Sequence, residues 1–219
     1  MISEERLEKF KKVVACRQYD LTVILENVHD VHNIGAILRS CDSVGIQEIF
    51  VINSRGQQQA EEFKGKTASR GASKWLHIHY FEDVETCLAT VRQKYKKIFT
   101  THLSIESREL FQMDFTESMA LVFGNEHDGV SDEMLEICDG NFVIPQIGMT
   151  NSLNISVAVA VTLYEAFRQK LAAGHYQEHY QPGEPVQTAL LEEFVYKSRP
   201  KVFDMDPTLL EGIMKSTKD

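Results

Sequence analysis

Short apolar runs alternate along the chain with longer segments in which apolar residues recur every three or four positions. The short runs have the length of buried strands, and the periodic segments have the spacing of amphipathic helices. The predicted strands are 21–26, 48–52, 75–81, 98–103, 119–124 and 142–145. The predicted helices are 3–17, 33–44, 83–97, 154–173, one that begins near Ser131, and short ones at 58–64, 188–196 and 207–214. This alternation predicts an α/β protein with a parallel sheet and right-handed crossovers.

Residues 144–166 stand out because no charged residue interrupts them until Glu165. Pro145 ends a predicted strand, Gly148 allows a tight loop, and Ser152 and Asn154 are both good helix N-cap residues. The helix that follows is apolar and small, which indicates burial or pairing on more than one face. A strand, a loop and a helix N-terminus together offer backbone N–H groups to a small ligand. The same pattern also fits an ordinary capped helix in a core βα unit.

The length of 219 residues suits one α/β domain with appendages, and 43% hydrophobic residues can form a sizeable core. The charged N-terminus lacks the apolar region of a signal peptide, and no apolar run reaches membrane-spanning length. Cys16, Cys41, Cys87 and Cys138 are scattered without a CxxC pair. They are typical of free thiols in a reducing compartment, so we expect a cytoplasmic protein without a disulfide framework.

Charge is distributed unevenly along the chain, whose formal net charge is −9. The segment 109–141 contains only acidic charged residues, whereas 55–74 and the N-terminal segment are locally basic. The basic residues of the N-terminal segment are Arg6, Lys9, Lys11, Lys12 and Arg17. The total argues against a protein that coats nucleic acid, but local basic patches can still bind RNA. Solvated helix faces are the simpler alternative.

Several catalytic patterns are absent or incomplete. The segment 124–131 has the glycine spacing of a phosphate-binding loop, but Val130 replaces its lysine. The histidine pairs at 29/32, 77/79 and 175/179 lack an accompanying cysteine or carboxylate set, so no metal site is predicted. Neither a dinucleotide-binding GxGxxG nor a GxSxG nucleophile motif occurs.

Three polar loops containing glycine follow predicted strands, at 27–39, 124–131 and 145–154. Ligands of open α/β sheets bind beyond the carboxyl ends of strands, so these loops are predicted to form one site. Its candidate side chains are Asn33, Arg39, Glu126, Ser152 and Asn154. Arg39 lies on an otherwise apolar helix, where a guanidinium is costly unless it is paired or functional. A salt bridge between Arg39 and Glu126 would be the structural explanation.

The three loops carry motifs in a specific order and spacing. The motifs are Asn33-x-Gly35-x-x-x-Arg39, then Phe123-Gly124-Asn125-Glu126-x-x-Gly129, and then Ile144-Pro145 followed by Gly148-Met149-x-x-Ser152-Leu153-Asn154-x-Ser156-x-Ala158. Together they resemble the signature motifs of the SpoU-type (SPOUT) RNA ribose 2′-O-methyltransferases, over about residues 20–174. The segment 15–23 and the helical extensions are similar to the tRNA guanosine-18 methyltransferase (TrmH) subgroup.

This resemblance implies a SPOUT methyltransferase domain at 20–174, with helical extensions at 1–19 and 175–219. The parallel sheet of that domain would carry a C-terminal trefoil knot, a rare exception to unknotted topology. S-adenosylmethionine would be bound in the knot, largely through the backbone, by Thr101, Leu103, Gly124, Ile144 and Leu153. The enzyme would be a homodimer in which the partner chain completes each active site.

The resemblance also implies the reaction, which is methyl transfer to a ribose 2′-hydroxyl of RNA, with the D-loop guanosine 18 of tRNA as the expected target. Arg39, Asn33, Glu126, Ser152 and Asn154 match the catalytic and substrate positions. Asp30-Val31 stands where relatives of the tRNA type often have Lys-Pro, and Thr150-Asn151 replaces the usual Val-Gln. The alternatives are ribosomal RNA, another tRNA position, or an RNA-binding module without turnover.

Overall fold

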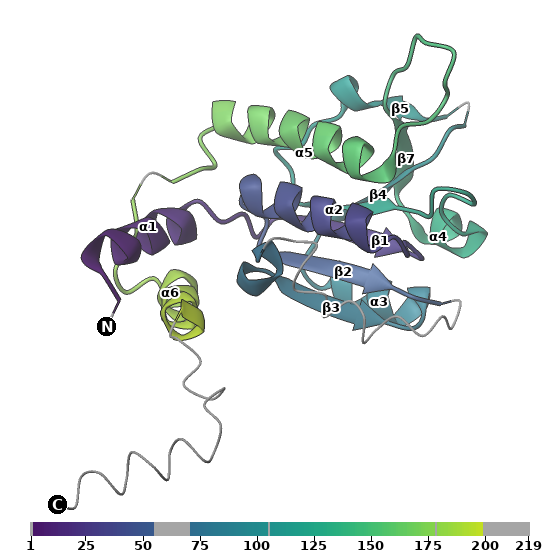
Figure 1. Ribbon diagram of the computed structural model, residues 1–219. Coiled ribbons are helices and arrows are strands. Elements are labelled where there is room, and N and C mark those ends of the chain that lie inside the picture. The colour runs from purple at the N-terminus through teal and green to yellow at the C-terminus, as the bar shows by residue number, and fades with distance from the viewer. Residues whose placement is uncertain (1, 55–70, 105, 178, 199–219) are drawn as a thin grey trace, which may run out of the picture.

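The computed structural model describes residues 2–54, 71–104, 106–177 and 179–198. A seven-stranded sheet forms the centre of the molecule, with helices on both of its faces (Figure 1). The strands are β1 Leu21–Glu26, β2 Glu48–Ile52, β3 His77–Phe81, β4 Lys97–Thr101, β5 Arg108–Glu109, β6 Met119–Phe123 and β7 Gly140–Val143. The α-helices are α1 Glu4–Ala15, α2 Val31–Ser43, α3 Val84–Arg92, α4 Asp132–Ile137, α5 Ile155–Ala172 and α6 Pro185–Ser198, and two 3-10 helices cover η2 Ala72–Trp75 and η3 Leu110–Gln112.

The sheet is parallel throughout, in the order β3-β2-β1-β6-β4-β7-β5. This confirms the predicted α/β class. Strands β1, β6, β4 and β7 are neighbours, so the loops that follow them meet at one edge of the sheet. No helix among the described residues is both long and apolar enough to span a bilayer.

Two apolar clusters form the core, one on each face of the sheet. Helices α2 and α5 pack side by side on one face, where Ile37 and Val159 are fully buried (Figure 1). Helices α3 and α4 cover the other face through Leu88 and Met134. In β1, alternate residues belong to different clusters, as the pleat of a strand requires. Both faces of the sheet are therefore buried, as is typical of parallel sheets.

Strand β7 lies between β4 and β5, although β4 and β5 follow one another in the chain. Thr101 at the end of β4 and Arg108 at the start of β5 both pair with Phe142 of β7. Thr101 and Arg108 therefore lie on opposite sides of β7, near its carboxyl end. Strand β5 has only two residues and was not predicted, because so short a segment has no periodicity.

The terminal helices α1 and α6 pack against each other at the amino-end side of the sheet. Phe10 of α1, Phe194 of α6 and Trp75 form an aromatic cluster, with ring centroids 4.9–5.7 Å apart. Ser3 caps α1 by accepting a hydrogen bond from the amide of Arg6, so the predicted start of this helix is confirmed. Helix α6 begins at Pro185, three residues before the start predicted at 188.

Buried ion pairs join the N-terminal segment to the domain. The Arg17 guanidinium is fully buried and donates to Asp42 Oδ1 at 2.7 Å and to the Ile46 carbonyl at 3.0 Å. The Lys170 ammonium near the end of α5 donates to Asp20 Oδ2 at 2.7 Å and is also fully buried. Burying a charge is costly without a partner, so these pairs fix where β1 starts relative to α2 and α5.

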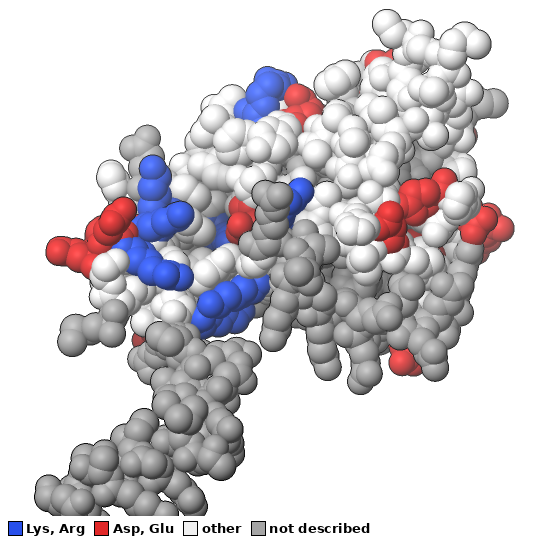
Figure 2. Space-filling model, viewed as in Figure 1, with Lys and Arg blue, Asp and Glu red and all other residues white. Residues whose placement is uncertain are grey.

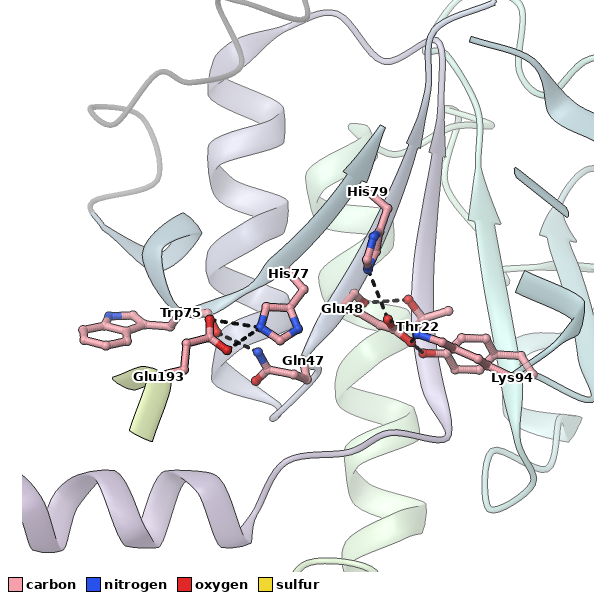
Figure 3. A network of polar contacts seen from close by, with 9 residues as sticks. Thr22, Gln47, Glu48, Trp75, His77, His79, Lys94 and Glu193 are labelled. Atoms are coloured by element: carbon pink, nitrogen blue, oxygen red, sulfur yellow. Dashed lines mark hydrogen bonds and ion pairs between the residues drawn. The ribbon is translucent and has the colours of Figure 1, made fainter. Parts of the chain in front are cut away.

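A polar network covers the amino ends of β2 and β3 (Figure 3). The carboxylate of Glu48 contacts Lys94, Tyr95 and His79, while His77 contacts Glu193 of α6. Burial disfavours the charged form of Glu48, but the hydrogen bonds from Lys94 and Tyr95 outweigh it and lower its pKa below the ordinary value. His77 and His79, one of the histidine pairs considered in the sequence, thus each have a carboxylate partner.

Several predicted boundaries differ from the structure. Helix α2 begins at Val31, two residues before the predicted start, because Asp30 caps it by accepting a hydrogen bond from the His32 amide at 2.7 Å. Asn154 rather than Ser152 is the N-cap of α5. The third predicted strand begins at His77, since η2 occupies 72–75. The helices predicted at 58–64 and 207–214 lie outside the described residues.

Candidate active site

The predicted site lies at the carboxyl edge of the sheet, where the loops after β1, β6 and β7 meet. Asn33 on the first turn of α2 donates from Nδ2 to Glu126 Oε1 at 2.7 Å. Asn154 at the start of α5 donates from Nδ2 to Asn33 Oδ1 at 3.1 Å. One chain of hydrogen bonds therefore joins the three predicted loops, from Asn154 through Asn33 to Glu126.

Asn154 has two structural roles in this chain. Its Oδ1 caps α5 by accepting from the Ser156 amide at 2.9 Å and from the Ser156 hydroxyl at 2.6 Å. Its Nδ2 remains available for Asn33. The cap fixes the side-chain rotamer, so the amide group points toward α2 without further support.

The loop that carries Glu126 is closed on itself. The backbone N–H of Asn125 donates to the Gly129 carbonyl at 2.9 Å, and the Gly129 N–H returns a bond of 2.9 Å to the Asn125 carbonyl. Gly129 has φ +71°, a conformation that glycine adopts without strain. A Cβ on Gly124 would lie 2.2 Å from the Gly129 carbonyl, so only glycine fits there. These contacts hold Glu126 at the tip of a compact turn.

Arg39 and Ser152 are close in sequence to this hydrogen-bond chain but do not take part in it. Both are exposed, and neither side chain makes a hydrogen bond or ion pair with any described residue. The salt bridge between Arg39 and Glu126, the alternative explanation for Arg39, is not present, and Glu126 Oε1 accepts a hydrogen bond from Asn33 instead. The guanidinium of Arg39 is thus available to an anionic ligand.

The residues predicted to bind a cofactor also gather at this edge. Thr101, Gly124 and Ile144 stand at or just beyond the carboxyl ends of β4, β6 and β7, which are adjacent strands. The side chains of Leu103 and Leu153 are 73% and 37% exposed, which leaves apolar surface beside the loop backbone. Apolar side chains beside backbone polar groups fit a ligand with an aromatic base and a short aliphatic chain.

The structure also shows contacts that the sequence analysis missed. Asn27, directly after β1, accepts a hydrogen bond from Asn125 Nδ2 at its carbonyl oxygen, with a distance of 2.9 Å. Glu26 accepts from the Ser131 amide at 3.0 Å. The available signal was a glutamate and an asparagine at the end of an otherwise apolar strand.

Among the described residues, no group of three or more histidine, cysteine or carboxylate side chains has the geometry of a metal site.

The chain resembles known proteins in both sequence and structure. Residues 20–164 match the SpoU rRNA Methylase family. The chain is 40% identical over 174 residues to the tRNA (guanosine(18)-2′-O)-methyltransferase of Thermus thermophilus, covering 80% of this chain and 88% of that protein. The crystal structure of a TrmH/SpoU tRNA modifying enzyme from Aquifex aeolicus is 35% identical with a TM-score of 0.78, covering 90% of this chain and 98% of that one. The SpoU methyltransferase AviRb of Streptomyces viridochromogenes, solved in complex with AdoMet, is 27% identical with a TM-score of 0.62, covering 71% and 60%.

The tight loop at Gly124 provides a test of this site. Gly124→Ala is expected to lower the thermal unfolding temperature and separate Glu126 from Asn33, because the new methyl group would overlap the Gly129 backbone. Gly148→Ala is the matched control, since a Cβ there has no atom within 4 Å. Calorimetric unfolding of both variants measures the difference. Equal stability of the two variants would contradict the steric argument.

Proposed function

This chain belongs to the SpoU rRNA Methylase family, and from that premise we propose that it transfers a methyl group from S-adenosylmethionine to the ribose 2′-hydroxyl of guanosine 18 in tRNA. The observation that carries the proposal is the hydrogen-bond chain from Asn154 through Asn33 to Glu126, which assembles all three family motifs at one edge of the sheet. An RNA-binding module that kept the fold but had no catalytic activity would not require this arrangement of side chains.

Transfer RNA is the favoured substrate because the similarity to the tRNA enzymes includes the extensions. The comparison with the Aquifex aeolicus structure covers 90% of this chain, more than the family match at 20–164 alone. Ribosomal RNA and other tRNA positions are the competing substrates.

The four cysteines are free thiols, which is in keeping with activity in the cytoplasm.

Thr101, Leu103, Gly124, Ile144 and Leu153 would hold S-adenosylmethionine, with the apolar side chains beside its base and the backbone at its polar edges. When bound, this cofactor would supply a sulfonium-bound methyl group, whose carbon a hydroxyl oxygen can attack while the carbon–sulfur bond breaks and a neutral thioether leaves. The protein's main contribution would be to hold the ribose in line with that methyl group, and such alignment can supply several kcal/mol.

We assign Arg39 to the phosphate next to the reacting ribose. A guanidinium holds its proton too firmly to serve as a good general base. It can bind a phosphate through two N–H groups and stabilise the negative charge that develops on the 2′-oxygen. The absence of an ion pair among the described residues leaves Arg39 able to do so.

Asn33 and Glu126 would orient the ribose, and Ser152 and Asn154 would shape the loop around it. Glu126 uses Oε1 for Asn33, so its other oxygen can accept a hydrogen bond from a ribose hydroxyl. Loss of the 2′-proton would be assisted by the adjacent phosphate or by water.

A trefoil knot is the proposed topology of the C-terminal part of the domain. Two observations support it. Thr101 and Arg108 lie on opposite sides of β7, and the chain leaving β7 continues into the loop that leads to α5. The domain itself would span 20–174, flanked by the extensions 1–19 and 175–219.

The first experiment is methyl transfer from labelled S-adenosylmethionine to total tRNA and to ribosomal RNA, followed by nucleoside mapping. The expected result is label in 2′-O-methylguanosine at position 18 of tRNA, with a tRNA transcript carrying adenosine at that position as control. Label confined to ribosomal RNA would favour the alternative substrate. No label in either RNA would contradict the proposal.

Arg39→Lys tests the phosphate contact. Lysine keeps the charge but loses the two-pronged geometry, so we expect kcat to fall about tenfold or more while cofactor binding is retained. Steady-state kinetics and calorimetry with S-adenosylmethionine separate these effects. Near-normal kcat would rule out a role that depends on two parallel hydrogen bonds.

A homodimer would form through the exposed apolar stripe of α5. Val157, Val161 and Tyr164 are 46%, 36% and 54% exposed on one side of this helix. Figure 2 shows the face over α2 and α5 as largely uncharged. A face of this kind is typical of an interface, since exposed apolar patches usually mark association sites.

Val161→Glu should therefore convert the dimer to a monomer, because it places a charge within the stripe. Sedimentation velocity at constant protein concentration measures the change. Val186→Glu is the control, since Val186 is 49% exposed on α6, away from the stripe. A monomeric wild-type protein would contradict the proposed dimer.

The basic side of α1 is the proposed contact for the body of the RNA. Lys9, Lys11 and Lys12, together with Glu8, His179, Tyr180 and Pro182, line an open hollow of about 700 Å³, and Glu8 pairs with Lys11. Figure 2 shows Lys and Arg over α1, with acidic side chains beside them. The segment 55–74, predicted to share this role, lies largely outside the described residues.

Lys9→Glu combined with Lys12→Glu is expected to weaken tRNA binding and flatten its dependence on salt, because fewer counterions are released. Filter binding at several salt concentrations measures both effects, and S-adenosylmethionine affinity serves as the control. Charge reversal is preferable to deleting residues 1–18, because Phe10 and Val14 pack against α6. Unchanged affinity and salt dependence would exclude α1 from the RNA contact.

A further inference from the structure

Strand β1 ends in two polar residues that are almost completely buried. Glu26 is 1% exposed and Asn27 is 4% exposed, and both follow an apolar run. Burying a carboxylate or an amide is unfavourable unless hydrogen bonds replace those to water. Their contacts should therefore explain why polar groups occur here.

Asn27 holds the beginning of the loop that carries Glu126. Its carbonyl oxygen accepts from Asn125 Nδ2 at 2.9 Å. Its own backbone has φ 52°, which is uncommon for a residue with a side chain. The side chain stabilises this conformation, because Oδ1 accepts from the Ser54 amide at 3.0 Å and Nδ2 donates to the Ser54 hydroxyl at 3.1 Å.

Glu26 holds the end of the same loop. Its Oε2 accepts from the backbone N–H of Ser131 at 3.0 Å, on the face of the sheet covered by α3 and α4. Its other oxygen, Oε1, is buried and has no hydrogen-bond partner among the described residues. An unsatisfied buried oxygen is costly, so stability alone does not account for a glutamate at this position.

We propose that Glu26 and Asn27 are positioning residues that together hold both ends of the loop 125–131 and thereby keep Glu126 against Asn33. The Asn125–Gly129 backbone pair makes the loop stiff between these two contacts. A shift at either end therefore moves Glu126, whose contact with Asn33 is 2.7 Å long. The effect on turnover that this inference predicts rests on the proposed function. The effect on the hydrogen bond between Asn33 and Glu126 does not, because it can be measured without any activity.

Two substitutions of Glu26 separate positioning from packing. Glu26→Gln keeps an oxygen that can accept from the Ser131 amide, so kcat should stay within about twofold of wild type. Glu26→Met keeps a similar length but removes the acceptor, so kcat should fall about tenfold, with the KM for tRNA and the cofactor Kd changed less than about threefold. An unchanged kcat in Glu26→Met would overturn the proposal.

A double-mutant cycle with Glu126→Gln tests whether Glu26 acts through Glu126. If it does, the Glu26→Met/Glu126→Gln variant should be no slower than Glu126→Gln alone. If the reduction in kcat of the double variant equals the product of the two single reductions, the two residues act independently, and the proposal is overturned. Ser131→Ala is the control, since it removes the hydroxyl that caps the Met134 amide but keeps the backbone N–H that Glu26 binds. It should lower thermal stability without lowering kcat.

Two further measurements apply if Glu26→Met does not fold or if the wild-type chain is inactive. If Glu26→Met does not fold, Asn125→Asp removes the donor to the Asn27 carbonyl at the other end of the loop and should show the same non-additivity with Glu126→Gln. If the wild-type chain methylates no RNA, the proposed function fails. A crystal structure of Glu26→Met then tests by itself whether Glu26 positions Glu126. Asn125→Asp replaces this variant if Glu26→Met does not fold. An Asn33–Glu126 hydrogen bond retained in that variant would contradict the positioning role.

Discussion

Hydrogen bonds among Asn33, Glu126 and Asn154 join three segments that are far apart in the sequence. These bonds can form only because the rest of the domain brings the three segments together. Side-chain amides and carboxylates reach only a few ångströms, so α2, the β6 loop and the start of α5 must be placed with little freedom. The parallel sheet meets this requirement because β1, β6, β4 and β7 are neighbours and end at one edge. Packing of α2 on α5 through buried apolar residues holds the two helix starts together.

Much of the fold could be predicted because it depends on local pattern. Strands β1 and β2 have the predicted bounds, since their apolar runs are bordered by polar residues. Helix α2 begins earlier than predicted because the capping group is Asp30, in a position where the sequence alone offered several polar candidates. Strand β5 and the strand order depend on contacts between distant segments, which periodicity along the chain does not encode.

The structure brings the three predicted loops together, and in it Glu126 pairs with Asn33 rather than with Arg39. A salt bridge between Arg39 and Glu126 follows from charge alone, yet Asn33 lies nearer the start of α2 and forms the bond instead. Glu26 and Asn27 were overlooked because a strand that ends in polar residues usually marks only the return to solvent. Their burial, which reveals their importance, is a property of the folded chain.

The net charge of −9 is compatible with RNA binding because the charges are segregated. Figure 2 shows basic side chains over α1 beside a group of acidic ones, while further acidic side chains gather near the opposite end of the molecule. At physiological salt, charges separated by more than about 8 Å of solvent largely cease to act on each other. Helix α1 carries four basic and three acidic side chains, so a phosphate is attracted to its basic side, and the distant carboxylates cancel little of that attraction. The local field, rather than the sum over the chain, decides where RNA can bind.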